Sequence, residues 1–418
     1  MQQWRMTHSM LFKGAKRSQD VSDGCVDRNQ MRRFKSRHTV CLFLCVLVVL
    51  ISGRVSLLAE SGPPLRTGLW VTQRVPQNAA EMSEFESMVR TNSYLSGVCL
   101  HIGWKEIEDK ADHLDFSAID KTVAVLRHAG RKYELGIKPG ADTPPFVYQE
   151  GAKSFETQVT NPHRANIGEA VVIPVPWDPI YQSHFSHVIQ QAGERYSADP
   201  LCVSVVLTCA NFNSSEMHLP KTPADRAKWE AMGNYETRLL EVYKKYTDEW
   251  GKAFPHQAIT LHLSQVLDLP SAFFERIIDY GLSKYPERFT IQNCQLTGRA
   301  EDTAIISYNL VQKYADHAHH GFQSAAGLSH GNERMGSLEM AVLNVIHAKG
   351  EYWELWHGDG VRVETSARIA KAWEEGRRLG YDAYKQKLIS EGSYREGPDR
   401  YRPKGRRGRR NAGLTPQV

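Results

Sequence analysis

Eight short apolar runs alternate with longer amphipathic stretches between about residues 66 and 360. The runs cover residues 67–75, 95–104, 132–140, 202–211, 258–266, 289–296, 321–328 and 352–358. In the stretch FSAIDKTVAVLRHAG, the apolar residues Ile119, Val123 and Leu126 fall on one helical face. Strands that alternate with helices of this length predict βαβ units and a parallel sheet. Eight such units favour a closed (β/α)8 barrel, an α/β fold, as a single domain over residues 61–390.

An open dinucleotide-binding sheet lacks its sequence signal. Such a sheet would place a glycine-rich turn after its first strand, and TGLWVTQRVPQN contains none. This absence favours the barrel.

The formal net charge of +5 is concentrated at the two ends of the chain. Basic residues cluster in RRFKSRH, residues 32–38, and in RYRPKGRRGRR, residues 400–410, so the middle is near neutral. We therefore expect no nucleic-acid partner. Residues 391–418 contain few apolar side chains and are predicted to form a disordered basic tail.

The first 60 residues have the pattern of an N-terminal extension followed by a signal peptide. A basic flank precedes TVCLFLCVLVVLI, residues 39–51, which is short for a membrane span, and small and polar residues follow it. The sequence therefore predicts export to the periplasm or the exterior, with Met31 as the true start. The alternative is a tether to the membrane through residues 39–51.

The cysteines and histidines of the folded part give no expected metal site. Cys99, Cys202, Cys209 and Cys294 lie in apolar runs without CxxC spacing, which predicts buried free thiols. The cluster DHAHHG, residues 316–321, precedes a strand and is predicted to lie as surface histidines at the amino-terminal face of the barrel.

Polar and aromatic side chains follow the predicted strands, at the end where barrel enzymes build their sites. The stretch VSVVLTCANFNSSEMHLP, residues 203–220, begins as a buried strand and delivers Asn211, Asn213 and Glu216. Aromatic rings stack on sugars, amides and carboxylates bind their hydroxyls, and cleavage of a glycosidic bond needs two carboxyl groups. The other candidate site residues of this kind are Trp104, Trp177, Asp178, Gln295, Glu354, Trp356 and Asp359.

Three segments resemble TIM-barrel glycoside hydrolases. GVCLHIGWKEIEDKADHLDFSAIDKTVAVLRHAG and KYELGIKPGADTPPFVY are similar to the second and third strands of the family-42 β-galactosidases. SSEMHLP resembles the fourth-strand acid motif of β-amylases. The resemblance covers roughly residues 66–360, and it implies a carbohydrate substrate, no cofactor, and Glu216 as the general acid.

The position of the second carboxylate in the chain departs from the pattern of these enzymes. Such enzymes carry it after the seventh strand, where GFQSAAGLSHGN has none before Glu333. Glu354 on the eighth strand is the first candidate for nucleophile or base, with Glu333 and Asp359 as others. Two alternatives stay open: a barrel that binds glycans without cutting them, and a lyase or isomerase that uses Lys138 as base or Schiff-base amine.

Overall fold

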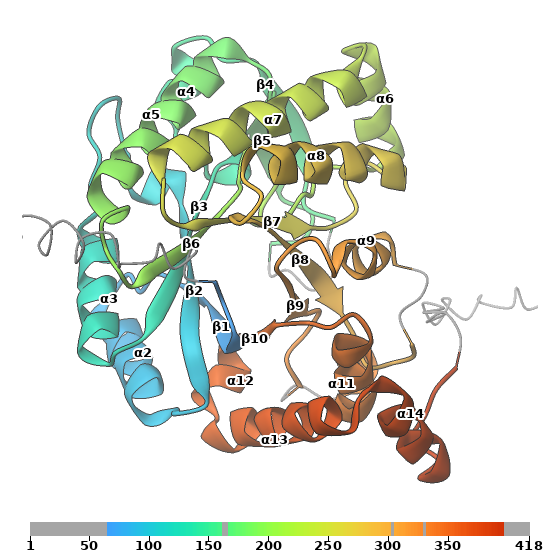
Figure 1. Ribbon diagram of the computed structural model, residues 1–418. Helices are drawn as coiled ribbons and strands as arrows, with labels where there is room; N and C mark the ends of the chain where they lie inside the picture. The colour runs from blue at the N-terminus through green and yellow to red at the C-terminus, as the bar shows by residue number, and fades with distance from the viewer. Residues whose placement is uncertain (1–64, 161–165, 302–304, 329–331, 397–418) are drawn as a thin grey trace, which may run out of the picture. The chain divides into compact units, whose positions relative to one another are not determined.

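Eight parallel strands close into a barrel in the computed structural model, which describes residues 65–160, 166–301, 305–328 and 332–396 (Figure 1). Around the barrel the strands follow the order β1-β10-β9-β8-β7-β6-β3-β2. Their bounds are Gly68–Arg74 (β1), Leu95–Gly103 (β2), Lys132–Lys138 (β3), Cys202–Val206 (β6), Ala258–Leu263 (β7), Phe289–Leu296 (β8), His320–Ser324 (β9) and Tyr352–Trp356 (β10). Each strand coincides with one of the eight predicted runs, so the predicted (β/α)8 TIM barrel is confirmed.

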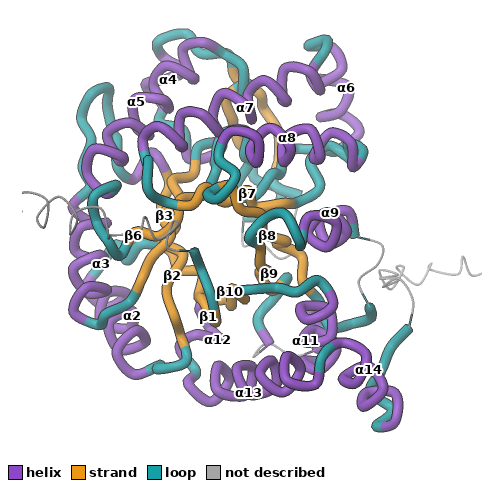
Figure 2. Tube along the Cα trace, viewed as in Figure 1, coloured by secondary structure: helices purple, strands orange, loops and turns teal. Residues whose placement is uncertain are grey.

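Helices surround the strands as an outer layer (Figure 2). The longer ones are α2 (Ala79–Thr91), α3 (Ser117–His128), α5 (Pro179–Tyr196), α6 (Pro223–Ala231), α7 (Tyr235–Ala253), α8 (Ser271–Lys284), α9 (Ile306–Tyr314), α11 (Leu338–His347), α13 (Val363–Leu379) and α14 (Tyr381–Ser390). The shorter ones are η1 (Trp104–Glu106), η2 (Gly140–Asp142), α4 (Pro145–Gln149), α10 (Asn332–Met335) and α12 (His357–Val361).

Several helices begin at side chains that bind the free amides of the first turn. Asn78 accepts from Glu81 N before α2, and Thr222 forms a capping box with Asp225 at the start of α6. Asp178 accepts from the amides of Ile180 and Tyr181 ahead of α5. These local contacts fix where the strand-to-helix connections end.

A two-stranded antiparallel sheet of β4 (Ser154–Gln158) and β5 (Ala170–Pro174) interrupts the β/α alternation between α4 and α5. The sequence analysis did not predict it. Phe155 on β4 stacks on Trp229 of α6, with ring centroids 4.0 Å apart. The insertion is therefore packed against a helix of the barrel.

Apolar side chains fill the layer between strands and helices, whereas the barrel interior is largely polar. Strand residues such as Val71, Leu135 and Trp353 belong to the main hydrophobic cluster with the helices. Buried polar residues lie on the alternate strand positions; they include Glu134, Ser204, Thr260, His262, Gln292, Gln323 and Glu354. The period of two along each strand separates the two sets.

The predictions for the two ends of the chain concern residues that lie largely outside the described ones. The predicted extension and signal peptide, residues 1–60, lie outside them, as does most of the predicted tail. Within the tail, residues 391–396 are described, and Tyr394 OH donates to Glu301 Oε2 at 2.7 Å. Among the described residues, no helix has the length and apolar character to cross a membrane.

The cysteine prediction is confirmed, because all four described cysteines are buried and free. The surface placement of the histidine cluster is wrong for His320, which is fully buried on β9. Its ring nitrogens lie 2.9 Å from Ala318 O and 2.6 Å from Ala348 O, so backbone carbonyls hold it in place.

Gly140, at the end of β3, fixes the loop that follows β6. Its φ of +70° is in the left-handed region, and a Cβ there would lie 2.3 Å from the carbonyl oxygens of Asn211 and Phe212. The next residue, Ala141, donates its amide to Phe212 O at 2.7 Å. Only glycine allows this close approach of two backbones.

Gly140→Ala is expected to destabilise the protein more than Gly130→Ala. Gly130 also has a positive φ, of +63°, but a Cβ there would meet nothing within 4 Å. Both substitutions carry a backbone cost of about 1 kcal/mol, and only Gly140→Ala adds a steric cost of about 1–3 kcal/mol. Urea unfolding measures the difference, and equal losses would contradict the packing described here.

Candidate functional site

Arg66 lies directly before β1, and its guanidinium group enters the barrel interior. Its Nη1 donates to Oε2 of Glu134 at 2.7 Å and to Oε2 of Glu354 at 3.1 Å. Its Nη2 donates to Oε1 of Gln292 at 2.6 Å and to the hydroxyl oxygen of Tyr352. The three charged side chains are 0–2% exposed. One cation therefore joins β3, β8 and β10 across the barrel.

The other carboxylate oxygens are also hydrogen-bonded. Ser204 donates to Oε1 of Glu134 at 2.7 Å, and Gln323 donates to Oε1 of Glu354 at 2.9 Å. Because buried charges are costly without partners, these bonds are what allow two carboxylates inside the barrel. Glu354 is thus engaged on both oxygens and fully buried.

The pKa values of the two carboxyl groups shift in opposite directions. Burial opposes ionisation of Glu134, but Arg66 and His262 outweigh it and hold its pKa below its usual range. For Glu354, burial is the largest influence and raises the pKa, with Arg66 only partly offsetting it. The barrel interior therefore favours a negative charge on Glu134 more than on Glu354.

The loop after β6 carries Glu216 and is held to the barrel at several points. Asn211 uses both ends of its amide: Oδ1 accepts from Cys209 N at 2.7 Å, and Nδ2 donates to Glu216 O at 2.6 Å. Met217 N donates to His262 O, on β7, at 3.1 Å. The peptide unit between Glu216 and Met217 is therefore held on both its oxygen and its amide, at the carboxyl end of β7.

The Glu216 side chain interacts electrostatically with Cys294 of β8. Gln292, which binds Arg66, also donates to Cys294 Sγ at 3.5 Å, so the two residues share the inner face of β8. Burial raises the pKa of Cys294, and the negative charge of Glu216 is the second cause of that rise. Glu216 itself is half-buried.

The three candidate tryptophans lie in different surroundings. Trp104 is fully buried in the outer core, against Phe185 with ring centroids 5.2 Å apart, so its ring has no face open to a sugar. Trp177 is partly buried and meets Trp229 edge-on at 6.1 Å. Trp356 ends β10 with 40% of its surface exposed, and its Nε1 donates to Ser324 O at 2.6 Å. Trp356 alone of the three combines exposure with a position at the end of a barrel strand.

Most of the candidate amides and aspartates have structural partners. Asp178 is the buried cap of α5, and Asp359, also buried, accepts from Leu328 N at 2.8 Å. Gln295 is partly buried, and its Oε1 accepts from Ser307 Oγ at 3.0 Å. Asn213 is partly buried in the loop that carries Glu216.

Lys138, the residue of the lyase alternative, is partly buried beside a carboxylate. Its Nζ lies 3.4 Å from Oδ2 of Asp142, with the lysine side chain 22% exposed. Asp142 also pairs with a second cation, Lys105, whose Nζ lies 3.1 Å from Oδ1. A lysine beside another cationic group can act as a Schiff-base amine, so the lyase alternative stays a prediction.

Three residues that shape the interior, Arg66, Glu134 and His262, were not predicted as site residues from the sequence. Two of them had a sequence signal, because His262 in AITLHL and Glu134 in KYELGIK are polar residues within mainly apolar strands. Arg66 precedes its strand, so only the three-dimensional structure shows that its side chain turns into the barrel.

Asn211→Asp and Asn211→Ala are expected to loosen the loop in different ways. Aspartate still accepts from Cys209 N but cannot donate to Glu216 O, whereas alanine loses both bonds. Hydrogen exchange should therefore speed up in peptides covering residues 215–219 for both variants. It should speed up in peptides covering residues 207–210 for Asn211→Ala alone. Unchanged exchange in residues 215–219 would contradict the bridging role of Asn211.

The sequence matches no protein-family model, and no curated protein matches it. Among solved structures, a β-galactosidase from the psychrophilic Marinomonas ef1 is 12% identical, with a TM-score of 0.49, over 77% of this chain and 62% of that one. A β-galactosidase from the haloarchaeon Halorubrum lacusprofundi is 14% identical, with a TM-score of 0.48, over 74% and 58%.

The catalytic domain of a β-amylase from Paenibacillus polymyxa is 11% identical, with a TM-score of 0.45, over 72% of this chain and 94% of that domain. This chain spans about three fifths of the length of the two β-galactosidases. Similarity at this level concerns the course of the chain through the barrel and not the chemistry of the site.

Proposed function

We propose that this protein acts on carbohydrate at the carboxyl end of its barrel, with Glu216 as the general acid that protonates the leaving oxygen. The observation that carries the proposal is the anchored loop after β6. Asn211 and the Met217–His262 backbone bond hold the backbone of Glu216, whose side chain is half-buried, at the carboxyl end of β7. Parallel-barrel enzymes place catalytic groups at this end of their strands.

Other side chains at the same end suit a sugar. Trp356 offers a partly exposed ring whose orientation is fixed by its bond to Ser324 O, as stacking on a pyranose requires. Asn213 and Gln295 are partly buried polar groups that we assign to sugar hydroxyls. We also propose that residues 39–51 direct the protein out of the cytoplasm. Its substrate would then be an oligo- or polysaccharide outside the cytoplasm.

The second carboxyl group decides between cutting and binding. Glu354, the proposed nucleophile or base, would have to exchange its bonds to Arg66 and Gln323 for contact with the sugar. Its complete burial favours the second candidate function, a barrel that binds glycans without hydrolysing them. Hydrolysis needs the two carboxyls about 5–10 Å apart across the bond to be cleaved.

A screen of aryl glycosides and polysaccharides with the full-length protein, Glu216→Gln and Glu86→Gln tests the acid role. Glu86 is an exposed helix residue paired with Arg90, and it serves as the charge-matched control. Loss of general acid catalysis should lower turnover by about 10²–10⁴-fold. The loss should be smaller on substrates with an acidic phenol as leaving group, because such a group departs without protonation.

Equal turnover by Glu216→Gln and wild type on unactivated substrates would remove Glu216 from the acid role. Saturable glycan binding by calorimetry, without turnover of any substrate, would identify the binding-only barrel. Absence of both binding and turnover across the screen would contradict the carbohydrate proposal.

A further inference from the structure

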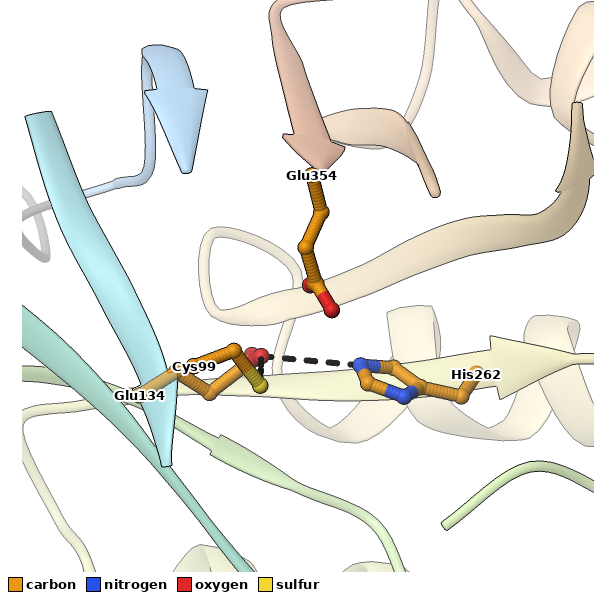
Figure 3. A group of neighbouring side chains, drawn as sticks. All are labelled: Cys99, Glu134, His262 and Glu354. Atoms are coloured by element: carbon orange, nitrogen blue, oxygen red, sulfur yellow. Dashed lines mark hydrogen bonds and ion pairs between the residues drawn. The ribbon is translucent and has the colours of Figure 1, made fainter. Parts of the chain in front are cut away.

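Four potential metal ligands from four strands meet inside the barrel, below the carboxyl end. They are the side chains of Cys99 on β2, Glu134 on β3, His262 on β7 and Glu354 on β10, all buried (Figure 3). One ligand atom from each lies within 4.8 Å of every other. Figure 3 shows the four side chains pointing toward a common centre.

These separations are close to those of a tetrahedral zinc site. Zinc–ligand bonds of about 2.0–2.3 Å place neighbouring ligand atoms roughly 3.3–3.8 Å apart. The Cys99 thiol donates a hydrogen bond to Glu134 Oε2 at 2.9 Å, and His262 Nε2 lies 3.5 Å from that same oxygen. Ligand atoms as far apart as 4.8 Å would have to approach by about 1 Å to reach the zinc geometry.

His262 points its Nε2 into this centre. The buried Nε2 makes no hydrogen bond and lies 3.5 Å from Glu134 Oε2, an ion-pair contact when His262 is protonated, while its Nδ1 lies 3.4 Å from Ser215 Oγ. If Nδ1 carries the proton and donates it to Ser215, then Nε2 presents a lone pair. This is the arrangement of a metal-binding histidine, whose second nitrogen is oriented by a hydrogen bond.

The two carboxylates have the same kind of support. Ser204 donates to Oε1 of Glu134, and Gln323 donates to Oε1 of Glu354, which leaves the Oε2 atoms toward the centre. Arg66 donates to both Oε2 atoms and lies beside the proposed ion. Ser204, Gln323 and Ser215 thus contact the atoms of Glu134, Glu354 and His262 that face away from the centre. Hydrogen bonds of this kind orient metal ligands in proteins.

Charge also balances with a divalent ion. Two carboxylates and one thiolate contribute −3, and the guanidinium of Arg66 with Zn²⁺ contributes +3. A metal-bound cysteine gives up its proton, so the thiolate is the form that counts. The competing arrangement contains no metal, a neutral Cys99 thiol and a protonated His262. In that arrangement the charges of His262 and Arg66 balance the two carboxylates.

We propose that Cys99, Glu134, His262 and Glu354 bind one structural Zn²⁺ ion at the centre of the barrel. Thiolate, imidazole and carboxylate together are a donor set that zinc accepts. Four protein ligands leave no open position, so the ion stabilises the fold and activates no water. It ties β2 and β3 to β7 and β10. It is compatible with Glu216 as the proposed acid, but it engages Glu354, the proposed nucleophile or base, so a bound ion favours the barrel that binds glycans without cutting them.

The test is metal binding by the full-length protein, unfolded with chelator and refolded with Zn²⁺ or with Co²⁺. We expect about one zinc per chain by mass spectrometry after dialysis, a higher Tm than in the metal-free protein, and a cobalt–thiolate charge-transfer band. Cys99→Ser should lose the band and bind zinc at least tenfold more weakly. Cys294→Ser is the matched control, because Cys294 is a buried barrel thiol outside the four ligands, and it should keep both.

Near-UV circular dichroism establishes that each variant is folded, and serine preserves the size and the hydrogen bond of Cys99. If Cys99→Ser does not fold, Glu354→Gln replaces it, since its amide keeps the shape but is a poor zinc ligand. A refolded wild type that retains no zinc would overturn the proposal. So would a Cys99→Ser or Glu354→Gln protein with unchanged zinc affinity.

Discussion

The guanidinium of Arg66 inside the barrel is the interaction on which the rest of this structure depends. It is the cation shared by two carboxylates, one from β3 and one from β10, and it also binds an amide and a phenol. Without it, Glu354 would be a buried charge bonded to the neutral amide of Gln323, and Glu134 would keep His262, at 3.5 Å, as the neighbour that can carry a positive charge. The cost of such burial is several kcal/mol per ion, which is comparable to the whole stability of an average domain.

The centre of the barrel and the carboxyl ends of its strands, the upper level, differ in their chemistry. At the centre, nearly every polar atom is engaged and solvent is excluded, which suits structure or a closed metal site. Above it, the loop after β6 presents Glu216 and Asn213, and Trp356 is exposed at the end of β10. A sugar could contact this upper level without disturbing the centre. The proposed acid and the proposed zinc ion therefore belong to separate parts of one barrel.

The sequence predicted the architecture well because period and spacing are local properties. Each barrel strand is a short apolar run bounded by turn or cap residues, and eight of them recur between helices. The antiparallel pair β4–β5 was missed because SFETQ and AVVIP are short and break the β/α alternation. Strand ends were also placed too late in places: residues 202–211 were read as one run, but β6 ends at Val206 and the rest forms the loop.

Side-chain roles were harder to predict, because they depend on contacts far apart in the chain. Asp178 and Trp104 have the residue types of a sugar site, yet one caps a helix and the other fills the core. For Glu354, the sequence suggested a partner acid, but the cation that engages it lies 288 residues earlier. No local pattern indicates such a pair.

The most direct test compares the stability of Arg66→Met with that of the triple variant Arg66→Met/Glu134→Gln/Glu354→Gln. Methionine keeps much of the apolar stem and removes the charge, so the single variant should lose about 3–5 kcal/mol of unfolding free energy in urea. Neutralising both carboxylates should recover most of that loss. Two results would contradict the central role of Arg66. One is an unfolding free energy of the single variant within about 1 kcal/mol of the wild type, as for an exposed ion pair. The other is a triple variant that is less stable than the single one.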